Sequence, residues 1–240
     1  MKFCMILTNN NRSKAYIQNL VKEDLIPSKV VYMFKKGSVL AEHTDNDSHI
    51  FDNTSQNFIS KCPVSGMVFN EKESIPQTLN KYKIPYDSEE SDDPNDKCVL
   101  DSVKKLPHQI CVYSGPGGKI LKPHFFKIGK TFIHAHPGKL PSFRGSTTIY
   151  YSLLISRSIY VSIIELNENL DEGDICLTDE YYFKPGASID FIVDPCVRAQ
   201  SLINYFKNKK RHKQQDQTGD TFYIIHPVLK HLSILKNNVF

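Results

Sequence analysis

FIHAHPGKLPSFRG (residues 132–145) is the stretch that indicates the fold of this chain most directly. In an extended segment the side chains of Phe132, His134 and His136 share one face. Apolar neighbours predict a buried strand, and the prolines and glycines that follow predict a rigid, kinked loop. Both imidazoles are therefore expected together at the carboxyl end of a strand, which is the edge where open α/β sheets bind ligands.

Working outward, short apolar runs alternate with helical patterns, which predicts an α/β fold with a largely parallel sheet. The predicted strands cover residues 2–8, 28–34, 108–114 and 130–136, and the predicted helices cover residues 12–22, 71–82 and 95–106. The acidic segment 87–96 is predicted to be a surface loop. Residues 37–66 give the weakest pattern.

After Gly145 the pattern predicts a helix capped by Ser146, and then strands over residues 158–166 and 174–183 joined by a turn. Residues 194–211 fit another helix. The tail, residues 221–235, is predicted to be strand-like on both sides of Pro227. We expect residues 1–240 to form a single domain, with residues 212–240 a short C-terminal extension packed on it.

Composition narrows the class of protein. Of 240 residues, 40% are hydrophobic and 23% are charged, which is typical of a soluble globular protein. A net charge of +4 is too small to indicate a nucleic-acid partner, and the basic run 207–213 is interpreted as the solvated end of a helix. The apolar N-terminal run is too short for a signal sequence or a membrane span.

The cysteines also bear on location. They are scattered without a CxxC pair, which predicts reduced core residues in a cytoplasmic protein: Cys4, Cys62, Cys98, Cys111, Cys176 and Cys196.

Two histidines on one strand face also fit a metal site. An HxH pair can present two ligands to zinc, and His124 or Asp171 would then be the third ligand. Residue spacing alone does not decide between this interpretation and a metal-free site.

The run IHAHPGKLPSFRGS resembles the signature of the formyltransferase family that uses 10-formyltetrahydrofolate, which reads roughly N-x-H-P-S-x-L-P-x-[FY]-[RK]-G. SGPGGKIL (residues 114–121) resembles the family's turn after the fourth strand, and LNENLDEGDI (residues 166–175) resembles its loop ending in D-x-G. The three matches occur in the family's order and cover residues 112–175. The resemblance implies a Rossmann-like, mostly parallel sheet flanked by helices.

The resemblance implies catalytic roles for three residues. His136 matches the family's catalytic histidine and Asp171 its aspartate, while His134 stands where the family usually has asparagine. That asparagine donates an N–H to the oxyanion of a tetrahedral intermediate. We expect His134 to stay neutral and to donate in its place, with His136 paired to Asp171. Gly138 replaces the usual serine.

The resemblance also implies where 10-formyltetrahydrofolate, the co-substrate, would bind. The expected cofactor-binding residues are Gly118, Lys119, Ile120, Leu121, Asn167 and Leu170. The residues expected to contact the acceptor are Asn9, Asn10, Ser13, Arg144 and Arg198. Either a monomer or a homodimer fits the sequence.

Two features that the sequence lacks reduce the number of possible formyl acceptors. The chain after the D-x-G loop is too short for the RNA-binding domain of methionyl-tRNA formyltransferases, and the segment 7–16 has no glycine-rich phosphate loop as in the purine enzymes. We therefore expect a primary amine on a nucleotide-linked sugar, used for glycan or polysaccharide biosynthesis. The alternatives are a folate-binding protein or 10-formyltetrahydrofolate hydrolase without transfer activity, and a metal-dependent hydrolase using His134 and His136.

Overall fold

The computed structural model describes residues 1–35, 59–208, 215 and 219–238. Its strands are β1 (Cys4–Thr8), β2 (Val30–Phe34), β3 (Ile59–Lys61), β4 (Val68–Asn70), β5 (Tyr86–Glu90), β6 (Ile110–Ser114), β7 (Thr131–His136), β8 (Phe143–Gly145), β9 (Ser158–Glu165), β10 (Ile175–Tyr182) and β11 (Asp220–Phe222). Its α-helices are α1 (Asn11–Lys22), α2 (Ile75–Lys81), α3 (Lys97–Lys104), α4 (Thr148–Ser156), α5 (Asp194–Lys207) and α6 (Pro227–Asn238). A 3-10 turn at Pro123–Lys127 precedes β7, and a π-helical turn at Ile189–Val193 leads into α5.

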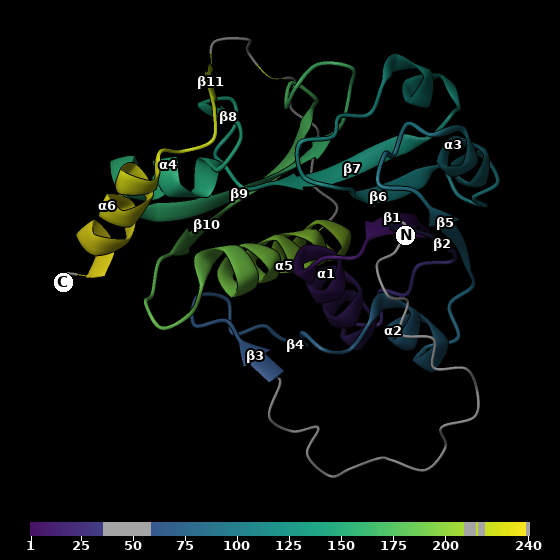
Figure 1. The fold of residues 1–240 in the computed structure, drawn as a ribbon, viewed down its shortest axis with the longest axis horizontal. Coiled ribbons are helices and arrows are strands. Elements are labelled where there is room, and N and C mark those ends of the chain that lie inside the picture. The colour runs from purple at the N-terminus through teal and green to yellow at the C-terminus, as the bar shows by residue number, and fades with distance from the viewer. Residues whose placement is uncertain (36–58, 209–214, 216–218, 239–240) are drawn as a thin grey trace.

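Seven strands form one sheet in the order β10-β9-β7-β6-β1-β2-β5 (Figure 1). The five strands from β7 to β5 are mutually parallel, and β9 and β10 are antiparallel additions at one edge. The prediction of a Rossmann-like, mostly parallel sheet flanked by helices is confirmed.

The sheet is covered on both faces because its central strands alternate between two apolar clusters. Met5 and Leu7 pack in the cluster that includes α1 and α5, whereas Cys4 and Ile6 pack in the cluster that includes α3. Figure 1 shows α1 and α5 side by side beneath the sheet. The same alternation holds in β7, where Phe132 lies in the α3 cluster.

The strand order places a crevice between β1 and β6. From β1 the chain crosses to β2 on one side, while β6 is followed by β7 on the other side. Ligands of open α/β sheets bind beyond the carboxyl ends of the strands at such a switch point. Asn9 follows β1, Gly115 follows β6 and Pro137 follows β7, so the loops at this edge are the place to look for a site.

Two sequence predictions about loops and caps are wrong. The first part of the predicted loop 87–96 belongs to β5, an edge strand whose charged sequence YDSEE suits an unpaired edge. Ser146 is not the N-cap of the helix after Gly145, and its backbone N–H donates to the Phe222 carbonyl of β11 at 2.8 Å. The helix instead begins after Thr147, whose side chain makes no capping bond.

The predicted strand after Pro227 is also wrong, because that segment is the helix α6. Proline is favoured in the first turn of a helix, where its missing N–H costs no hydrogen bond. α6 packs against α4, and the Asn237 side chain donates to the Leu153 carbonyl at 3.1 Å. That residues 212–240 form an extension of one domain stays a prediction.

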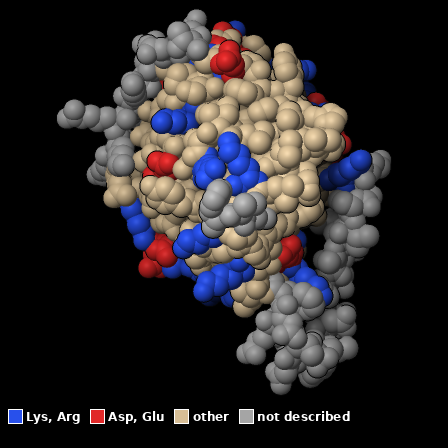
Figure 2. Space-filling model, turned by 90° about the vertical axis from the view of Figure 1, so that its left-hand side faces the viewer, with Lys and Arg blue, Asp and Glu red and all other residues tan. Residues whose placement is uncertain are grey.

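α6 also presents an apolar face to solvent, made by Val228, Leu229, Leu232 and Leu235. Figure 2 views the molecule from this side, and uncharged residues cover much of the surface. The homodimer that the sequence left open stays a prediction.

Several other sequence features can be placed. Residues 36–58 and most of the basic run 207–213 lie outside the described residues, while β3 and β4 form an antiparallel hairpin. None of the six cysteines forms a disulfide bond, and Cys98 alone is exposed. In the described part of the chain, no helix combines the length and the apolar character needed to cross a bilayer.

Candidate active site

A cavity of about 460 Å³ lies at the carboxyl ends of β6 and β7, between the first turns of α1 and α5. Its walls come from the loops 115–121, 166–171 and 221–224. His134 and His136 both line it, as the alternation along β7 predicts. The motif of residues 132–145 therefore lies beside the cavity, at the carboxyl ends of the strands near the switch point of the sheet.

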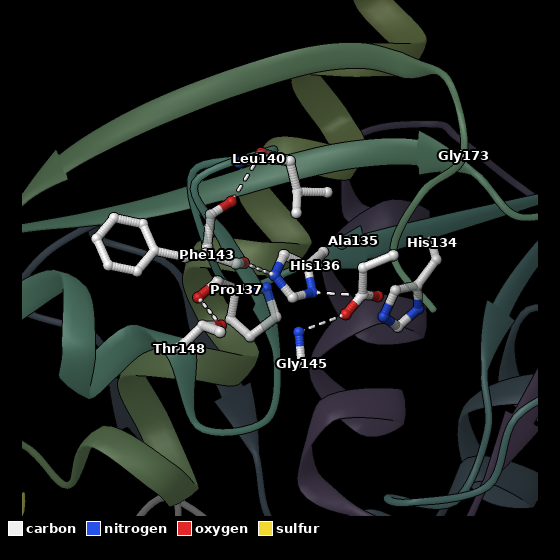
Figure 3. A network of polar contacts seen from close by, with 12 residues as sticks. His134, Ala135, His136, Pro137, Leu140, Phe143, Gly145, Thr148 and Gly173 are labelled. Atoms are coloured by element: carbon white, nitrogen blue, oxygen red, sulfur yellow. Dashed lines mark hydrogen bonds and ion pairs between the residues drawn. The ribbon is translucent and has the colours of Figure 1, made fainter. Parts of the chain in front are cut away.

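His136 is held between two hydrogen-bond acceptors (Figure 3). Its Nδ1 lies 3.4 Å from Asp171 Oδ1, and its Nε2 lies 2.7 Å from the Phe143 carbonyl. A neutral imidazole carries one N–H and satisfies one of these acceptors, whereas an imidazolium satisfies both. His136 is 2% exposed, so these two acceptors rather than water are the partners of its ring nitrogens.

Asp171 supplies the negative charge of this pair. Burial raises the pKa of its carboxyl, but His136 and the Gly145 N–H outweigh burial and bring the pKa down to about 2. Gly145 N donates to Asp171 Oδ2 at 2.8 Å, so each carboxylate oxygen has a fixed partner. Asp171 has φ +53°, a left-handed conformation that aspartate and asparagine adopt more readily than most residues.

The loop after β7 is fixed at three points. Thr148 Oγ1 donates to the Pro137 carbonyl at 2.7 Å, and Ser162 Oγ donates to the Gly138 carbonyl at 2.7 Å. Ser162 Oγ also accepts from Leu140 N at 3.1 Å. These bonds hold the Pro-Gly-Lys-Leu-Pro loop as a rigid frame around His136 (Figure 3).

Gly138 stands where the related motif has serine, and the structure gives a reason. A Cβ at this position would lie 2.8 Å from His136 Nε2 and 2.8 Å from the Phe143 carbonyl oxygen. The hydrogen bond between His136 and Phe143 therefore occupies the space that a side chain at position 138 needs.

Gly173 closes the D-x-G loop for a similar reason. A Cβ there would lie 1.6 Å from the Glu165 carbonyl oxygen at the end of β9. The backbone of the loop thus passes directly over β9, and this contact brings Asp171 back toward His136.

His134 takes a different hydrogen-bond role from the one the sequence suggested. Its Nδ1 lies 3.2 Å from the Tyr113 carbonyl, which can only accept, so Nδ1 carries the proton. Burial, and then the nearby Arg198 and Arg12, lower the pKa of His134 to about 3. The ring is therefore neutral, as expected, and its Nε2 is a lone-pair acceptor.

The expectation that His134 donates an N–H to an oxyanion is wrong for this tautomer, because the single N–H is bonded to Tyr113. Nε2 of His134 can instead accept a hydrogen bond from an amine N–H. The expected pairing of Asp171 with His136 agrees with the geometry.

The depressed pKa of His134 predicts a pH effect on stability. Above pH 6.5 the ring is neutral in both states, whereas below pH 6.5 the unfolded chain takes up a proton that the folded chain refuses until about pH 3. The free energy of unfolding should therefore decrease as the pH is lowered from 6.5 toward 3. At 1.36 kcal/mol per pH unit the loss by pH 4.5 is at most about 2.7 kcal/mol, and about 1–2 kcal/mol after allowing for the ring's access to the cavity.

Urea unfolding of the wild type and of His134→Gln between pH 7.5 and 4.5 measures this loss. Glutamine keeps a donor for Tyr113 but does not titrate, so the difference between the two proteins should shrink or reverse toward pH 4.5. Parallel pH profiles would mean that His134 has an ordinary pKa in the folded chain.

All the residues that the sequence assigned to the folate line the cavity: Gly118, Lys119, Ile120, Leu121, Asn167 and Leu170. Ile120 and Leu170 are 52% and 42% exposed, which makes one part of the mouth apolar. Asn167 Nδ2 donates to the Glu172 carbonyl at 3.2 Å and so also shapes the D-x-G loop.

Of the residues assigned to the acceptor, Arg198 alone lines the cavity. Asn10 caps α1 by accepting from Ser13 N at 2.8 Å, and Ser13 is fully buried against Ser114. Asn9 points to solvent, away from the cavity lining. Arg144 is buried and lies 3.3 Å from Glu172, so it supports the D-x-G loop from outside the cavity.

Sequence reasoning missed Arg12, Tyr113 and the segment 221–224, which also line the cavity. Arg12 could have been recognised from the sequence. A cation in the first turn of a helix is unfavourable next to the positive end of the helix dipole, so its presence there indicates a functional role. The segment 221–224 had no such signal, because its approach depends on the pairing of β11 with β8.

The metal alternative finds no support in the geometry. Among residues 1–35, 59–208, 215 and 219–238, no group of three His, Cys, Asp or Glu side chains is placed to hold a metal ion. Both ring nitrogens of His136 already face protein acceptors, and the ring of His124 packs against Phe125.

Comparison with known proteins gives the fold class. The structure resembles a phosphoribosylglycinamide formyltransferase from Anaplasma phagocytophilum, with a TM-score of 0.57 and 12% identity over 93% of this chain and 99% of that one. It also resembles an N-formyltransferase from Helicobacter canadensis, with a TM-score of 0.53 and 13% identity over 99% of this chain and 80% of that one. The chain therefore has the formyltransferase fold, which confirms the resemblance drawn from the sequence motif.

The sequence comparison is more limited. A methionyl-tRNA formyltransferase from Finegoldia magna is 26% identical over an alignment of 132 residues, which covers 51% of this chain and 43% of that enzyme. The match thus spans less than half the length of that relative. No protein-family model matches the chain.

Proposed function

We propose that this chain is an enzyme that transfers a formyl group from 10-formyltetrahydrofolate to a primary amine. The observation that carries the proposal is the His136–Asp171 pair, 3.4 Å apart beside the cavity and formed by two separate segments of the motif. A fold shared with formyltransferases of three acceptor classes supports it.

The folate would enter past the exposed side chains of Ile120 and Leu170. The loop 115–121 offers backbone groups that can bond a pterin, and the apolar mouth suits its ring system. The Helicobacter canadensis enzyme is described in complex with folinic acid and dTDP-3-aminofucose. That complex supports a folate and a nucleotide-linked amino sugar as ligands here.

The chain's own residues can serve the reaction as follows. The amine nitrogen bonds to the formyl carbon, the carbonyl oxygen becomes an oxyanion, and the bond to the folate nitrogen then breaks as that nitrogen gains a proton and the amine loses one. His134 Nε2 accepts an N–H of the amine and so orients its lone pair. The N–H groups of protonated His136 stay bonded to Asp171 and Phe143, and the positive charge of the ring stabilises the oxyanion electrostatically.

The finer proposal is that the acceptor is an amino group on a nucleotide-linked sugar, for glycan or polysaccharide biosynthesis in the cytoplasm. Enzymes of the purine and methionyl-tRNA classes share the fold, so the acceptor must be tested directly. The protein should be incubated with 10-formyltetrahydrofolate and a panel of nucleotide-linked amino sugars, glycinamide ribonucleotide and methionyl-tRNA. Mass spectrometry should show the gain of one CO unit on an amino sugar alone.

Formylation of glycinamide ribonucleotide or methionyl-tRNA instead would refute the sugar acceptor while leaving formyl transfer intact. If folinic acid does not bind and no amine is formylated, the proposed function itself is wrong.

A second candidate is hydrolysis of 10-formyltetrahydrofolate. The hydrogen bonds that favour it are those of the two histidines, since His136 directs both nitrogens to protein acceptors and His134 presents a lone pair that can bond a water molecule. Release of formate in the absence of any amine distinguishes this reaction from transfer.

A further inference from the structure

Two arginines from opposite ends of the chain meet at the inner part of the cavity. Arg12 lies in the first turn of α1 and Arg198 in the first turns of α5, and the two helices pack side by side. Both arginines line the cavity, and both lie close enough to His134 to lower its pKa.

This arrangement is electrostatically unfavourable without a ligand. Burial lowers the pKa of Arg12, and the positive charge of Arg198 lowers it further. The dipole of α1 adds positive potential at the same end of that helix. Arg198 is balanced by Asp194, whose Oδ1 accepts from Nε at 2.8 Å, but Arg12 makes no ion pair with any described residue.

Neutral groups hold Arg12 in place without cancelling its charge. Its Nε donates to Ser114 Oγ at 3.1 Å, and its Nη2 donates to the Gly115 carbonyl. Arg198 Nη1 similarly donates to the Ala135 carbonyl at 3.2 Å. These bonds fix both guanidinium groups while leaving Nη1 of Arg12 unbonded to the described residues, and such fixed forks suit phosphate and carboxylate.

A buried hydroxyl at the same place also lacks a partner. Tyr113 lines the cavity and is 5% exposed, yet its hydroxyl makes no hydrogen bond with the described residues. The positive charge of Arg12 is close enough to act on this hydroxyl. A buried O–H without a partner costs free energy, which an anionic oxygen atom would recover.

The charged side chains that line the whole cavity also favour an anionic ligand. Among the described residues, Arg12, Lys119 and Arg198 are its cationic side chains, apart from the histidines, and Asp171 is its one carboxylate. Asp171 is already paired with His136. The inner part of the cavity therefore keeps an excess of positive charge.

We propose that Arg12, Arg198 and Tyr113 form a subsite for an anionic group, a phosphate or a carboxylate, that the acceptor carries close to its reacting amine. The subsite lies beside His134, which would hold the amine. That the anion belongs to the acceptor rests on the proposed function, whereas the subsite itself does not.

The test measures binding of inorganic phosphate, and of acetate in a separate arm, by thermal shift and by ³¹P or ¹³C NMR titration of the full chain. Arg12→Gln and Arg198→Gln should each weaken binding of the preferred anion at least about tenfold, because each removes a fixed charge-assisted donor. Arg157→Gln, which removes an exposed arginine outside the cavity, should bind as the wild type does. Arg198→Lys keeps the charge beside Asp194 and should retain more affinity than Arg198→Gln, which separates loss of the subsite from loss of the fold.

Absence of saturable binding of either anion, or equal binding by the Arg12 and Arg157 variants, would overturn the proposal. The outcome is independent of formyl transfer. If the protein binds phosphate through Arg12 but formylates no amine, the subsite is supported and the proposed function is refuted. If it formylates an amine but binds neither anion, the proposed function is supported and the subsite is refuted.

Discussion

Asp171→Asn should lower formyl transfer by about 10³–10⁴-fold while the protein remains folded, as happens when a histidine loses the carboxylate that fixes its protonated state. Asparagine can keep the bond from Gly145 N through its carbonyl oxygen, which turns its NH₂ group toward His136 Nδ1. That nitrogen must then act as an acceptor, so His136 is confined to its neutral form. The positive charge beside the oxyanion is lost.

The substitution is well matched for this purpose. Asparagine tolerates the left-handed conformation of position 171, so the loop should not rearrange. Single-turnover rates with saturating folate, together with the melting temperature and folinic acid affinity, separate chemistry from folding and binding. Turnover within a few-fold of wild type would refute the assigned role of the His136–Asp171 pair.

Gly138→Ser should destabilise the protein by about 2 kcal/mol and lower turnover by about 10²-fold, although the formyltransferase motif that this segment resembles usually has serine at that position. The new Cβ would lie 2.8 Å from His136 Nε2, and 3.0 Å from Thr148 Oγ1. The loop cannot move away easily, because Thr148 and Ser162 hold it on both sides of position 138. His136 would therefore have to leave the Phe143 carbonyl.

Gly117→Ala is the matched control for stability, because a Cβ at Gly117 meets no atom within 4 Å. Denaturant unfolding should show a clear loss for Gly138→Ala and Gly138→Ser and little change for Gly117→Ala. If a serine at position 138 leaves both stability and turnover unchanged, the close approach of His136 to Gly138 is not a feature of the working enzyme.

The fold could be predicted largely from local patterns. The four strands predicted before Gly145 each end at the residue where β1, β2, β6 and β7 end, because polar and turn-forming residues follow the apolar runs abruptly. β5 was missed because an edge strand needs no apolar residues, and its acidic sequence therefore resembles a loop. α6 was missed because its apolar residues serve packing on α4 as well as an exposed face, which blurs the helical pattern.

The candidate site was predictable where one motif carries it and unpredictable where distant segments meet. His136 and Asp171 were paired through a family resemblance, since their separation along the chain gives no sign of contact. The tautomer of His134 depends on the position of the Tyr113 carbonyl, which only the packing of β6 beside β7 determines. Arg12 meets Arg198 because α1 packs on α5, and that contact leaves no trace in either local sequence.

The activity proposed for this protein is transfer of the formyl group from the folate to an amine. Single-turnover incubation of the protein with 10-[¹³C]formyltetrahydrofolate and the amine panel, followed by ¹³C NMR of the quenched mixture, measures the fate of that carbon. The label should appear as a formamide on an amino-sugar acceptor, in an amount equal to the tetrahydrofolate released, and Asp171→Asn should abolish this signal. Label recovered as formate whatever amine is present, or left on the folate, would refute formyl transfer to an amine.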